Sequence, residues 1–430
     1  DIQIAAMAKI IGLLLFVITT SLFFFPFSLI GLPFFNTKMI MALMGLVVYV
    51  FNASRRRMGA FPTKFVNLTI FAAVFSIVCF FAVIINNTTD YAYVTYIASM
   101  WVWMSGAYFA CHCIKWFYGE LSIKSVCDIL IVVCVVQCFL AQLIDSQTSL
   151  QMWVDSHIEQ GQDFLTEVKR IYGIGASLDV AGPRFSAELI LIAHILTTGG
   201  NKMPKWQIPA YLAAFAWITV AGNMIARTTS VGVVIGLIYM IIKLCGRTIE
   251  PEHARRICFW FIAIILIAIP ISVYFYNTNP GTMKLFRFAF EGFFNYFENG
   301  EWSISSNEKL ATMVVFPETL KTWIIGDGYF SNPINTDPYF TGVETGGYYM
   351  GTDVGYLRFI FYCGVIGLIA FSVFIIRCAH YCTKDFSDCK LLFWSICLLN
   401  FIIWLKVSTD IFLVFALFLM INTVNDEDNA

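Results

Sequence analysis

The sequence predicts an all-α protein that crosses a membrane many times. Its 430 residues are 59% hydrophobic and only 13% charged, which is more apolar than a soluble globular chain, and the mean hydropathy is +0.75. Apolar runs near the length of a membrane span, about 20 residues, recur along the whole chain. The net charge of −1 excludes the basic footprint of a nucleic-acid-binding protein.

About twelve apolar runs qualify as candidate spans. In the first half they lie at 10–31, 35–53, 65–85, 91–113, 123–144 and 185–199. In the second half they lie at 206–222, 228–245, 256–276, 353–376, 390–405 and 408–424. The short last pair, around Lys406 and Asp410, could instead be one re-entrant hairpin. No internal repeat or soluble domain is evident, so residues 1–430 are predicted to form a single integral membrane domain.

Lysines and arginines near the span ends predict the orientation, because positively charged loops stay in the cytoplasm. They occur on alternate loops, at Arg55 to Arg57 with Lys64, Lys115 with Lys124, Lys202 with Lys205, Arg247 with Arg255 and Arg256, and Arg377 with Lys384 and Lys390. All five loops therefore face the same side. This sends a first loop, 145–184, and a large loop, 277–352, to the outer side.

The large loop runs from turn-forming residues into the apolar helix expected at 353–376. Long loops in compact proteins are commonly lids or binding segments, so we expect a site at this junction. The stretch LFRFAFEGFFNYFE within the loop predicts one amphipathic helix, lying either in the membrane interface or on the outer protein surface. Its apolar face would hold Phe286, Phe290, Phe293, Phe294 and Phe297, with Lys284, Arg287, Glu291 and Glu298 towards the other face.

Arginines on the outer side are the main anomaly of the sequence. Arg227 lies at an apolar boundary, where a permanent charge is costly unless it is paired, faces water or snorkels to the interface. Arg170 and Arg184 begin and end the segment RIYGIGASLDVAGPR. The Arg170 fork would suit phosphate oxygens, with the glycines letting the backbone approach closely. Arg184 precedes Glu188 by four residues, so a local helical salt bridge is its plainest interpretation.

Asp353 begins the helix expected at 353–376 and has two interpretations. It could cap the helix, or it could face an outer cavity and accept a proton from an attacking hydroxyl. Tyr356 and Tyr172, near Asp353 and Arg170, are candidate substrate-binding residues. Asp327, with Asp337 and Glu344, could bind sugar hydroxyls or cations, although turn residues are the plainer interpretation.

No metal site or cofactor is predicted. The five histidines are scattered without the spacing of metal ligands, at His112, His157, His194, His253 and His380. The fingerprints of a P-loop, a nucleophile elbow and a dinucleotide-binding turn are also missing.

Several short segments resemble the bacterial O-antigen polymerase and O-antigen ligase superfamily, over about Arg170 to Phe371. They are RIYGIGAS before the sixth span, ARTTSVGVVIGL opening the eighth, IGDGYF in the large loop and DVGYLRFIFYCGVIGL after it. The superfamily's short motifs would correspond to Arg170–Gly173, Ala226-Arg227 and Gly326–Gly328.

The resemblance implies a metal-independent glycosyltransferase of the GT-C type in the bacterial inner membrane, with its site facing the periplasm. The donor would be a glycan on undecaprenyl pyrophosphate, held through its pyrophosphate by Arg170 and Arg227. A hydroxyl of the acceptor glycan would attack the anomeric carbon with inversion. A chain-length regulator and membrane lipids are the other partners that the resemblance brings into consideration.

The resemblance favours a polymerase of O-antigen or capsular polysaccharide. Ligases of the superfamily usually carry His-Asn before Xaa-Tyr-Leu, where this chain has Asp353-Val354, so Asp353 becomes the candidate base. A ligase that transfers glycan to lipid A-core is the first alternative. A transporter or flippase of an anionic lipid-linked glycan is the second.

Overall fold

The computed structural model describes residues 2–55, 62–161, 165, 170–200, 203–246, 249–334 and 346–427. Seventeen α-helices lie in this part of the chain. The sheet described there has three short antiparallel strands, β1 (Ser28–Leu29), β2 (Leu32–Asn36) and β3 (Ile158–Glu159), in the order β2-β1-β3. The predicted all-α class is confirmed.

Eight of the helices are long and apolar enough to cross a membrane. They are α2 (Thr37–Ser54), α3 (Thr63–Asn86), α4 (Tyr96–Tyr118), α5 (Ile123–Ser146), α8 (Leu178–Thr198), α9 (Gln207–Ile225), α11 (Pro251–Thr278) and α16 (Gly355–Asp385). The other expected spans overlap α1 (Ile2–Phe24), α10 (Thr229–Cys245), α17 (Lys390–Ile403) and α18 (Phe412–Asp426). The span expected at 10–31 is wrong at its end, because α1 ends at Phe24 and the chain continues into β1. Membrane-spanning character is thus supported, while the number and orientation of the crossings stay predictions. Of the basic residues behind that orientation, Arg56, Arg57, Lys202 and Arg247 lie outside the described residues.

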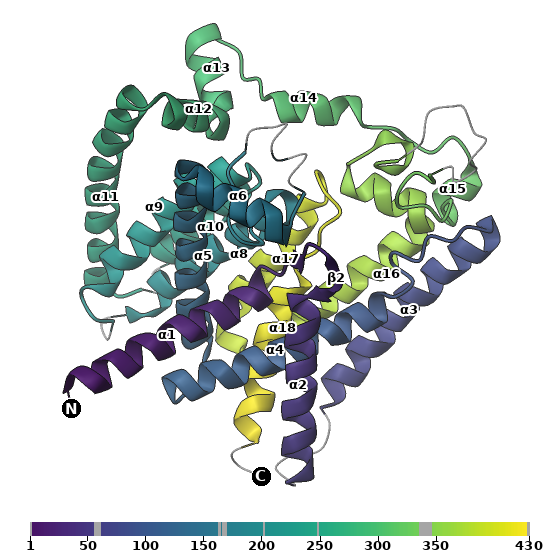
Figure 1. Cartoon of the computed structure of the whole chain (residues 1–430), viewed down its shortest axis with the longest axis horizontal. Helices are drawn as coiled ribbons and strands as arrows, with labels where there is room; N and C mark the ends of the chain where they lie inside the picture. The colour runs from purple at the N-terminus through teal and green to yellow at the C-terminus, as the bar shows by residue number, and fades with distance from the viewer. Residues whose placement is uncertain are drawn as a thin grey trace.

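Shorter helices connect the long ones. They are α6 (Thr148–His157), α12 (Pro280–Ala289), α13 (Glu291–Asn299), α14 (Ser305–Thr312) and α15 (Leu320–Ile324), with 3-10 turns at Tyr349–Gly351 and Ser387–Cys389. Helices α12 to α14, residues 280–312, form an arch that leads from α11 across the top of the molecule towards α15 (Figure 1). This arch contains most of the large outer loop that the structure describes.

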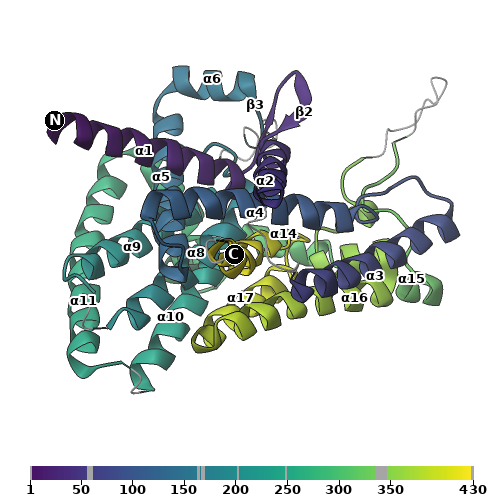
Figure 2. The same cartoon turned by 90° about the horizontal axis from the view of Figure 1, so that it is seen from below.

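Helix α8 lies in the middle of the molecule in both views (Figures 1 and 2). It packs so closely on α10 that a Cβ atom at Gly232 would lie 2.2 Å from the Ser186 Cα atom. The Ser186 hydroxyl donates to the Thr228 carbonyl at 2.9 Å and accepts from the Gly232 amide at 3.2 Å. Small residues at helix contacts permit this approach, which fixes the turn that carries Arg227.

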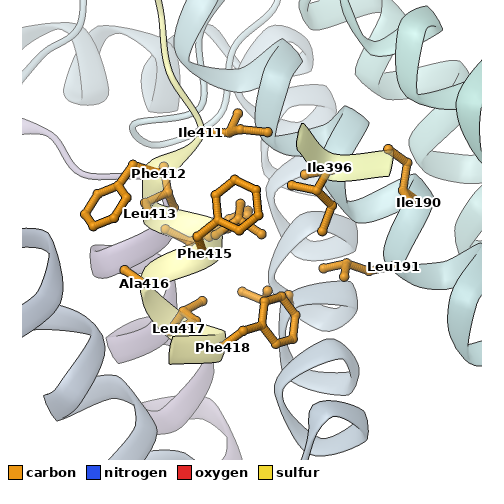
Figure 3. Close-up of a cluster of buried hydrophobic side chains, with 14 of the residues drawn as sticks. Ile190, Leu191, Ile396, Ile411, Phe412, Leu413, Phe415, Ala416, Leu417 and Phe418 are labelled. Atoms are coloured by element: carbon orange, nitrogen blue, oxygen red, sulfur yellow. The ribbon is translucent and has the colours of Figure 1, made fainter. Parts of the chain in front are cut away.

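Helices α17 and α18 form a hairpin whose second arm is enclosed by the rest of the protein. Every residue from Phe412 to Ile421 is buried. Figure 3 shows residues of α18 in one apolar cluster with Ile396 of α17 and with Ile190 and Leu191 of α8. The tip of this hairpin, residues 404–411, is therefore anchored in the core of the protein.

The first outer loop is shorter than the sequence predicts. Helix α8 begins at Leu178 and not at 185, because Gly182 and Pro183 interrupt the apolar pattern without ending the helix. Arg184 therefore lies inside α8, and the boundary predicted at 184 is wrong.

The single amphipathic helix predicted in the large loop is also wrong. The chain leaves helical geometry at Phe290 (φ −119°, ψ 30°), which separates α12 from α13. The predicted apolar face is consequently divided, and Phe293 and Phe297 are 56% and 81% exposed. Phe286 and Phe294 instead contact Tyr276 of α11, with ring centroids at 6.5 and 5.6 Å.

Helix α16 is broken at Gly364, where the backbone adopts φ 67° and ψ −178°. This conformation is essentially restricted to glycine. The break leaves the Phe361 and Tyr362 carbonyls free to accept from the Asp327 and Gly328 amides, at 2.6 and 3.1 Å. A Cβ atom at Gly364 would lie 2.0 Å from the Ile324 carbonyl oxygen. The kink therefore docks the end of the large loop onto α16.

Replacing Gly364 by Ala should destabilise the protein, by about 1 to 3 kcal/mol for the backbone conformation alone. The contact with Ile324 adds to this cost. The measurement is the apparent Tm of the purified protein in detergent. Gly12→Ala is the matched control, because Gly12 lies in α1 and a Cβ atom added there would have no neighbour within 4 Å. Equal Tm values for the two variants would contradict a structural role for the kink.

Candidate functional site

Four cationic side chains from separate segments lie around the N-terminal end of α8, and we call them the basic cluster. They are Arg170 before α8, Arg227 between α9 and α10, Arg358 in the first turn of α16, and Lys406 at the tip of the α17–α18 hairpin. Electrostatics indicates their proximity. Burial lowers the pKa of Lys406, and the charges of Arg170 and Arg227 lower it further, while Asp179 and Asp353 oppose the change.

Arg227 makes the closest contacts between the core and the arch. Its Nη1 atom lies 2.5 Å from Oε2 of Glu291 and 3.2 Å from Oγ of Ser306. The guanidinium carbon of Arg227 lies 4.0 Å from the centre of the Phe288 ring, and that of Arg170 lies 5.0 Å from the same ring. Two of the three arginines that the sequence singles out thus contact the same ring, that of Phe288.

Arg358 is held at the start of α16 by the hairpin tip and by aromatic rings. Its Nη1 donates to Oγ of Ser408 at 3.2 Å, and its Nη2 donates to the Phe330 carbonyl at 3.3 Å. The guanidinium carbon lies 3.7 Å from the centre of the Phe330 ring and 4.4 Å from that of Tyr348. These contacts fix its position but leave hydrogen-bonding capacity unused.

Three members of the basic cluster retain unused donors. The Nε atoms of Arg170, Arg227 and Arg358 are buried and have no hydrogen-bond partner among the described residues. A buried donor without a partner is costly, and a guanidinium binds phosphate or carboxylate oxygens through its planar fork. The cluster is therefore suited to an anion with several oxygen atoms.

Asp353 lies beside the basic cluster. Burial and the charge of Asp179 raise its pKa from 3.8 to about 7, although Arg358, Lys406 and a hydrogen bond with Tyr348 act in the opposite direction. Its Oδ1 atom is buried without a hydrogen-bond partner among the described residues and lies 3.6 Å from Nη1 of Arg358.

The alternative that Asp353 caps α16 is wrong. Val354 occupies the N-cap position, and no side-chain hydrogen bond caps the helix. The Asp353 carboxyl group therefore does not cap α16 and is available for proton transfer near neutral pH. A carboxyl group with a pKa close to the working pH is suited to general base chemistry.

Arg184 and Glu188 do not form the local salt bridge that their spacing predicts. Both carboxylate oxygens of Glu188 and Nη1 of Arg184 are buried without hydrogen-bond partners in the described part of the chain. The Arg184 guanidinium instead lies 5.7 Å from the Phe25 ring and 5.9 Å from the Trp103 ring. The opposing charge that acts on it most strongly is Asp410, and Arg184 is buried in the core of the protein.

The glycines after Arg170 serve packing. A Cβ atom at Gly173 would lie 2.3 Å from Oε1 of Gln137, and one at Gly175 would lie 2.3 Å from the Phe25 carbonyl oxygen. Gly175 also has a φ of 72°. The backbone of this segment therefore approaches α5 and the end of α1, which explains the two glycines, while the expected close approach to a phosphate stays a prediction.

The remaining candidate substrate-binding residues have protein partners. The Tyr172 hydroxyl donates to Asp155 at 2.6 Å, and the Tyr356 hydroxyl donates to the Phe401 carbonyl at 2.9 Å. The Thr322 hydroxyl donates to the Asp327 carboxylate at 2.8 Å. A binding role for these three residues stays a prediction.

Two acidic candidates in the large loop, Asp337 and Glu344, lie outside the described residues. Among the residues that are described, no group of three or more His, Cys, Asp or Glu side chains could hold a metal ion.

Sequence reasoning missed Arg358, Lys406 and Asp179. Arg358 and Asp179 lie within apolar helices, where an ionisable residue is by default a candidate for function. That rule would have found them if applied residue by residue. Lys406 was considered only as the position of a possible re-entrant hairpin, since nothing in the local sequence indicates its neighbours in space.

Comparisons of the chain with protein-family models, with characterised proteins and with solved structures found no match. Support for a function therefore comes from the short sequence motifs and from the site itself.

The raised pKa of Asp353 predicts a specific pH dependence of stability. Between the ordinary value of 3.8 and about 7, the folded protein keeps a proton that the unfolded chain loses. The contribution of this group to the free energy of unfolding therefore falls as the pH rises through this window. Asp353→Asn cannot ionise and should lack that contribution.

The measurement is the difference in apparent Tm between the wild type and Asp353→Asn at about pH 4 and about pH 8, the limits of the titration. We expect the wild type to lose stability relative to the variant at the higher pH. A difference that is the same at both values would contradict the raised pKa.

Proposed function

We propose that this protein is a membrane glycosyltransferase that polymerises oligosaccharide repeat units of O-antigen or capsular polysaccharide. The donor would be a repeat unit carried on undecaprenyl pyrophosphate, and the reaction would take place on the periplasmic side of the bacterial inner membrane. One observation carries the proposal. Arg358 and Lys406 lie beside a carboxyl group, Asp353, whose pKa is about 7, and the charges of Arg170 and Arg227, from two further segments, act on Lys406.

The basic cluster would bind the pyrophosphate and stabilise its departure. A pyrophosphate presents several anionic oxygens, and Arg170, Arg227 and Arg358 have unused buried donors for them. When the glycosidic bond breaks, its electron pair goes to the pyrophosphate oxygen, where fixed positive charge stabilises it. Lys406 would add a further charge, without any requirement for a metal ion.

Asp353 would act as the general base. An acceptor sugar hydroxyl attacks the anomeric carbon, a new carbon–oxygen bond forms, and the bond to the pyrophosphate breaks with inversion. The hydroxyl proton passes to the carboxylate of Asp353. Arg358, 3.6 Å from this carboxyl group, would orient it and favour its ionised form.

A transporter of the same lipid-linked glycan is the second candidate. The α17–α18 hairpin turns in the core at a non-helical tip that carries Lys406 and Asp410, and α16 is broken at Gly364. Discontinuous helices of this kind surround the binding sites of many transporters. A ligase would use the same donor site with a different acceptor, so the covalent products distinguish all three functions.

The test is to reconstitute the purified protein with repeat units linked to undecaprenyl pyrophosphate, without added metal, and to separate the products by size. A ladder of lipid-linked oligomers is expected from the wild type. Arg227→Ala should form no ladder while remaining folded. Arg287→Ala should form a normal one, because Arg287 pairs with Glu298 on the exposed side of the arch.

Unchanged donor in a folded preparation that binds it would contradict polymerisation. Movement of intact donor across the bilayer would support the transporter in its place. Transfer of one glycan to a supplied lipid A-core acceptor, without a ladder, would support the ligase.

Replacing Asp353 by Asn should lower kcat by about 10²- to 10⁴-fold, the usual contribution of a general base, with little change in the KM for the donor. Asp388→Asn is the matched control, since Asp388 is exposed at the other end of α16. Initial rates of oligomer formation provide the measurement. A nearly normal kcat for Asp353→Asn would remove this carboxyl group from the chemistry.

A further inference from the structure

The arch reaches the basic cluster through two side chains, Phe288 and Glu291. The Phe288 ring lies near the guanidinium groups of both Arg170 and Arg227. Glu291 forms the ion pair with Arg227, at 2.5 Å. Both residues come from the large loop, and both contact the arginines that would hold the donor.

Several hydrogen-bond donors surround the Glu291 carboxylate. Besides Arg227, its Oε2 atom accepts from the Ser305 amide at 3.3 Å and from the Ser305 hydroxyl at 3.0 Å. The Ser306 hydroxyl contacts Nη1 of Arg227 at 3.2 Å. Ser305 and Ser306 belong to the arch and would leave with it, whereas Arg227 stays on the core. A guanidinium binds phosphate oxygens as it binds carboxylate oxygens, so Oε2 of Glu291 occupies the position at Arg227 that a phosphate oxygen could take.

The contacts between the arch and the basic cluster can be broken and replaced by contacts with another anion. The side chains of Arg227 and Glu291 are 13% and 23% exposed, so water and an incoming anion can still reach the ion pair. Helices α12 and α14 are described in full, and no residue of either is buried. Segments with little buried surface open at low cost.

Exchange of one anion for another avoids the cost of an unpaired charge at Arg227. Removing one partner of a largely buried ion pair is strongly unfavourable, because the other charge is left uncompensated. A phosphate that arrives as Glu291 leaves keeps Arg227 paired in both states. In the closed state the Phe288 ring contributes cation–π contacts to both guanidiniums, which would otherwise repel each other.

We propose that Glu291 holds the place of the donor phosphate at Arg227, and that donor binding displaces Glu291 and releases the arch. This inference rests on the proposed function, because the displacing anion is the donor's pyrophosphate. Glu291 is then a positioning residue that competes with the donor and keeps the empty site closed. Phe288 is the part of the arch that must leave the space between Arg170 and Arg227.

The test compares the affinity of the wild type, Glu291→Gln and Glu298→Gln for undecaprenyl pyrophosphate in the same detergent. Glu291→Gln removes the competing charge, so its Kd should be about fivefold to tenfold lower than that of the wild type. Glu298→Gln is the matched control. It lies in the same helix and pairs with Arg287, away from the basic cluster, so its Kd should equal that of the wild type.

Hydrogen–deuterium exchange of the wild type gives a second readout that needs no variant. Amides of residues 291–312 should exchange faster when undecaprenyl pyrophosphate is bound, because the arch has been released. A merely structural role for Glu291 predicts no such change.

Failure of the Glu291 inference and failure of the proposed function give different results. If the wild type binds undecaprenyl pyrophosphate but Glu291→Gln binds it equally well and the arch exchanges no faster, the place-holding role of Glu291 is overturned and the proposed function stands. If the folded wild type does not bind this lipid, the proposed function is overturned, and this inference with it.

Discussion

Arginine stays protonated in proteins, even in an apolar environment. Every guanidinium group at an apolar boundary of this protein therefore needs a partner. The partners come from distant segments. Arg227 is paired with Glu291 of the arch, and Arg358 is bonded to Ser408 at the tip of the C-terminal hairpin. These pairings join the large loop to the turn between α9 and α10 and the hairpin to the start of α16. The need to compensate fixed charge thus organises the part of the molecule where we place the site.

The basic cluster and Glu291, the carboxylate that pairs with Arg227, lie on parts of the protein that differ in rigidity. Arg227 lies in a turn fixed by the close crossing of α8 and α10, and Lys406 lies on a hairpin anchored in the core. Glu291 lies on an arch whose flanking helices, α12 and α14, have no fully buried residue, although Leu285, Phe286 and Ala289 of α12 are partly buried against the core. Such an arrangement keeps the anion-binding geometry constant while its cover moves, as repeated binding and release of a lipid-linked donor would require.

The sequence predicted the helices well because the length of an apolar run is a local property. The predicted span 123–144 became α5, Ile123–Ser146. It also singled out Arg170 and Arg227, since arginines on the outer side of a membrane protein are conspicuous. Asp353 followed from its place at a helix start, although its position beside Arg358 and Lys406 could not be read from the chain.

The failures concern contacts between distant segments. The rule for residues four apart describes an exposed helix, whereas α8 is enclosed and its Arg184 turns towards Phe25 and Trp103. The helix expected over LFRFAFEGFFNYFE is broken at Phe290, and its Glu291 is engaged by Arg227. Arg358 was hidden in an apolar run, because its charge disappears in the average hydropathy of the window.

The most direct test of the central claim, that the basic cluster binds a pyrophosphate on a lipid, is a comparison of three lipids with the same hydrocarbon chain. The affinity of the purified protein would be measured for undecaprenyl pyrophosphate, undecaprenyl phosphate and undecaprenol in one detergent. We expect affinity to decrease in that order and the differences to shrink at high salt, because charge carries the recognition. Equal affinity for all three lipids would show that only the hydrocarbon chain is bound and would contradict the account.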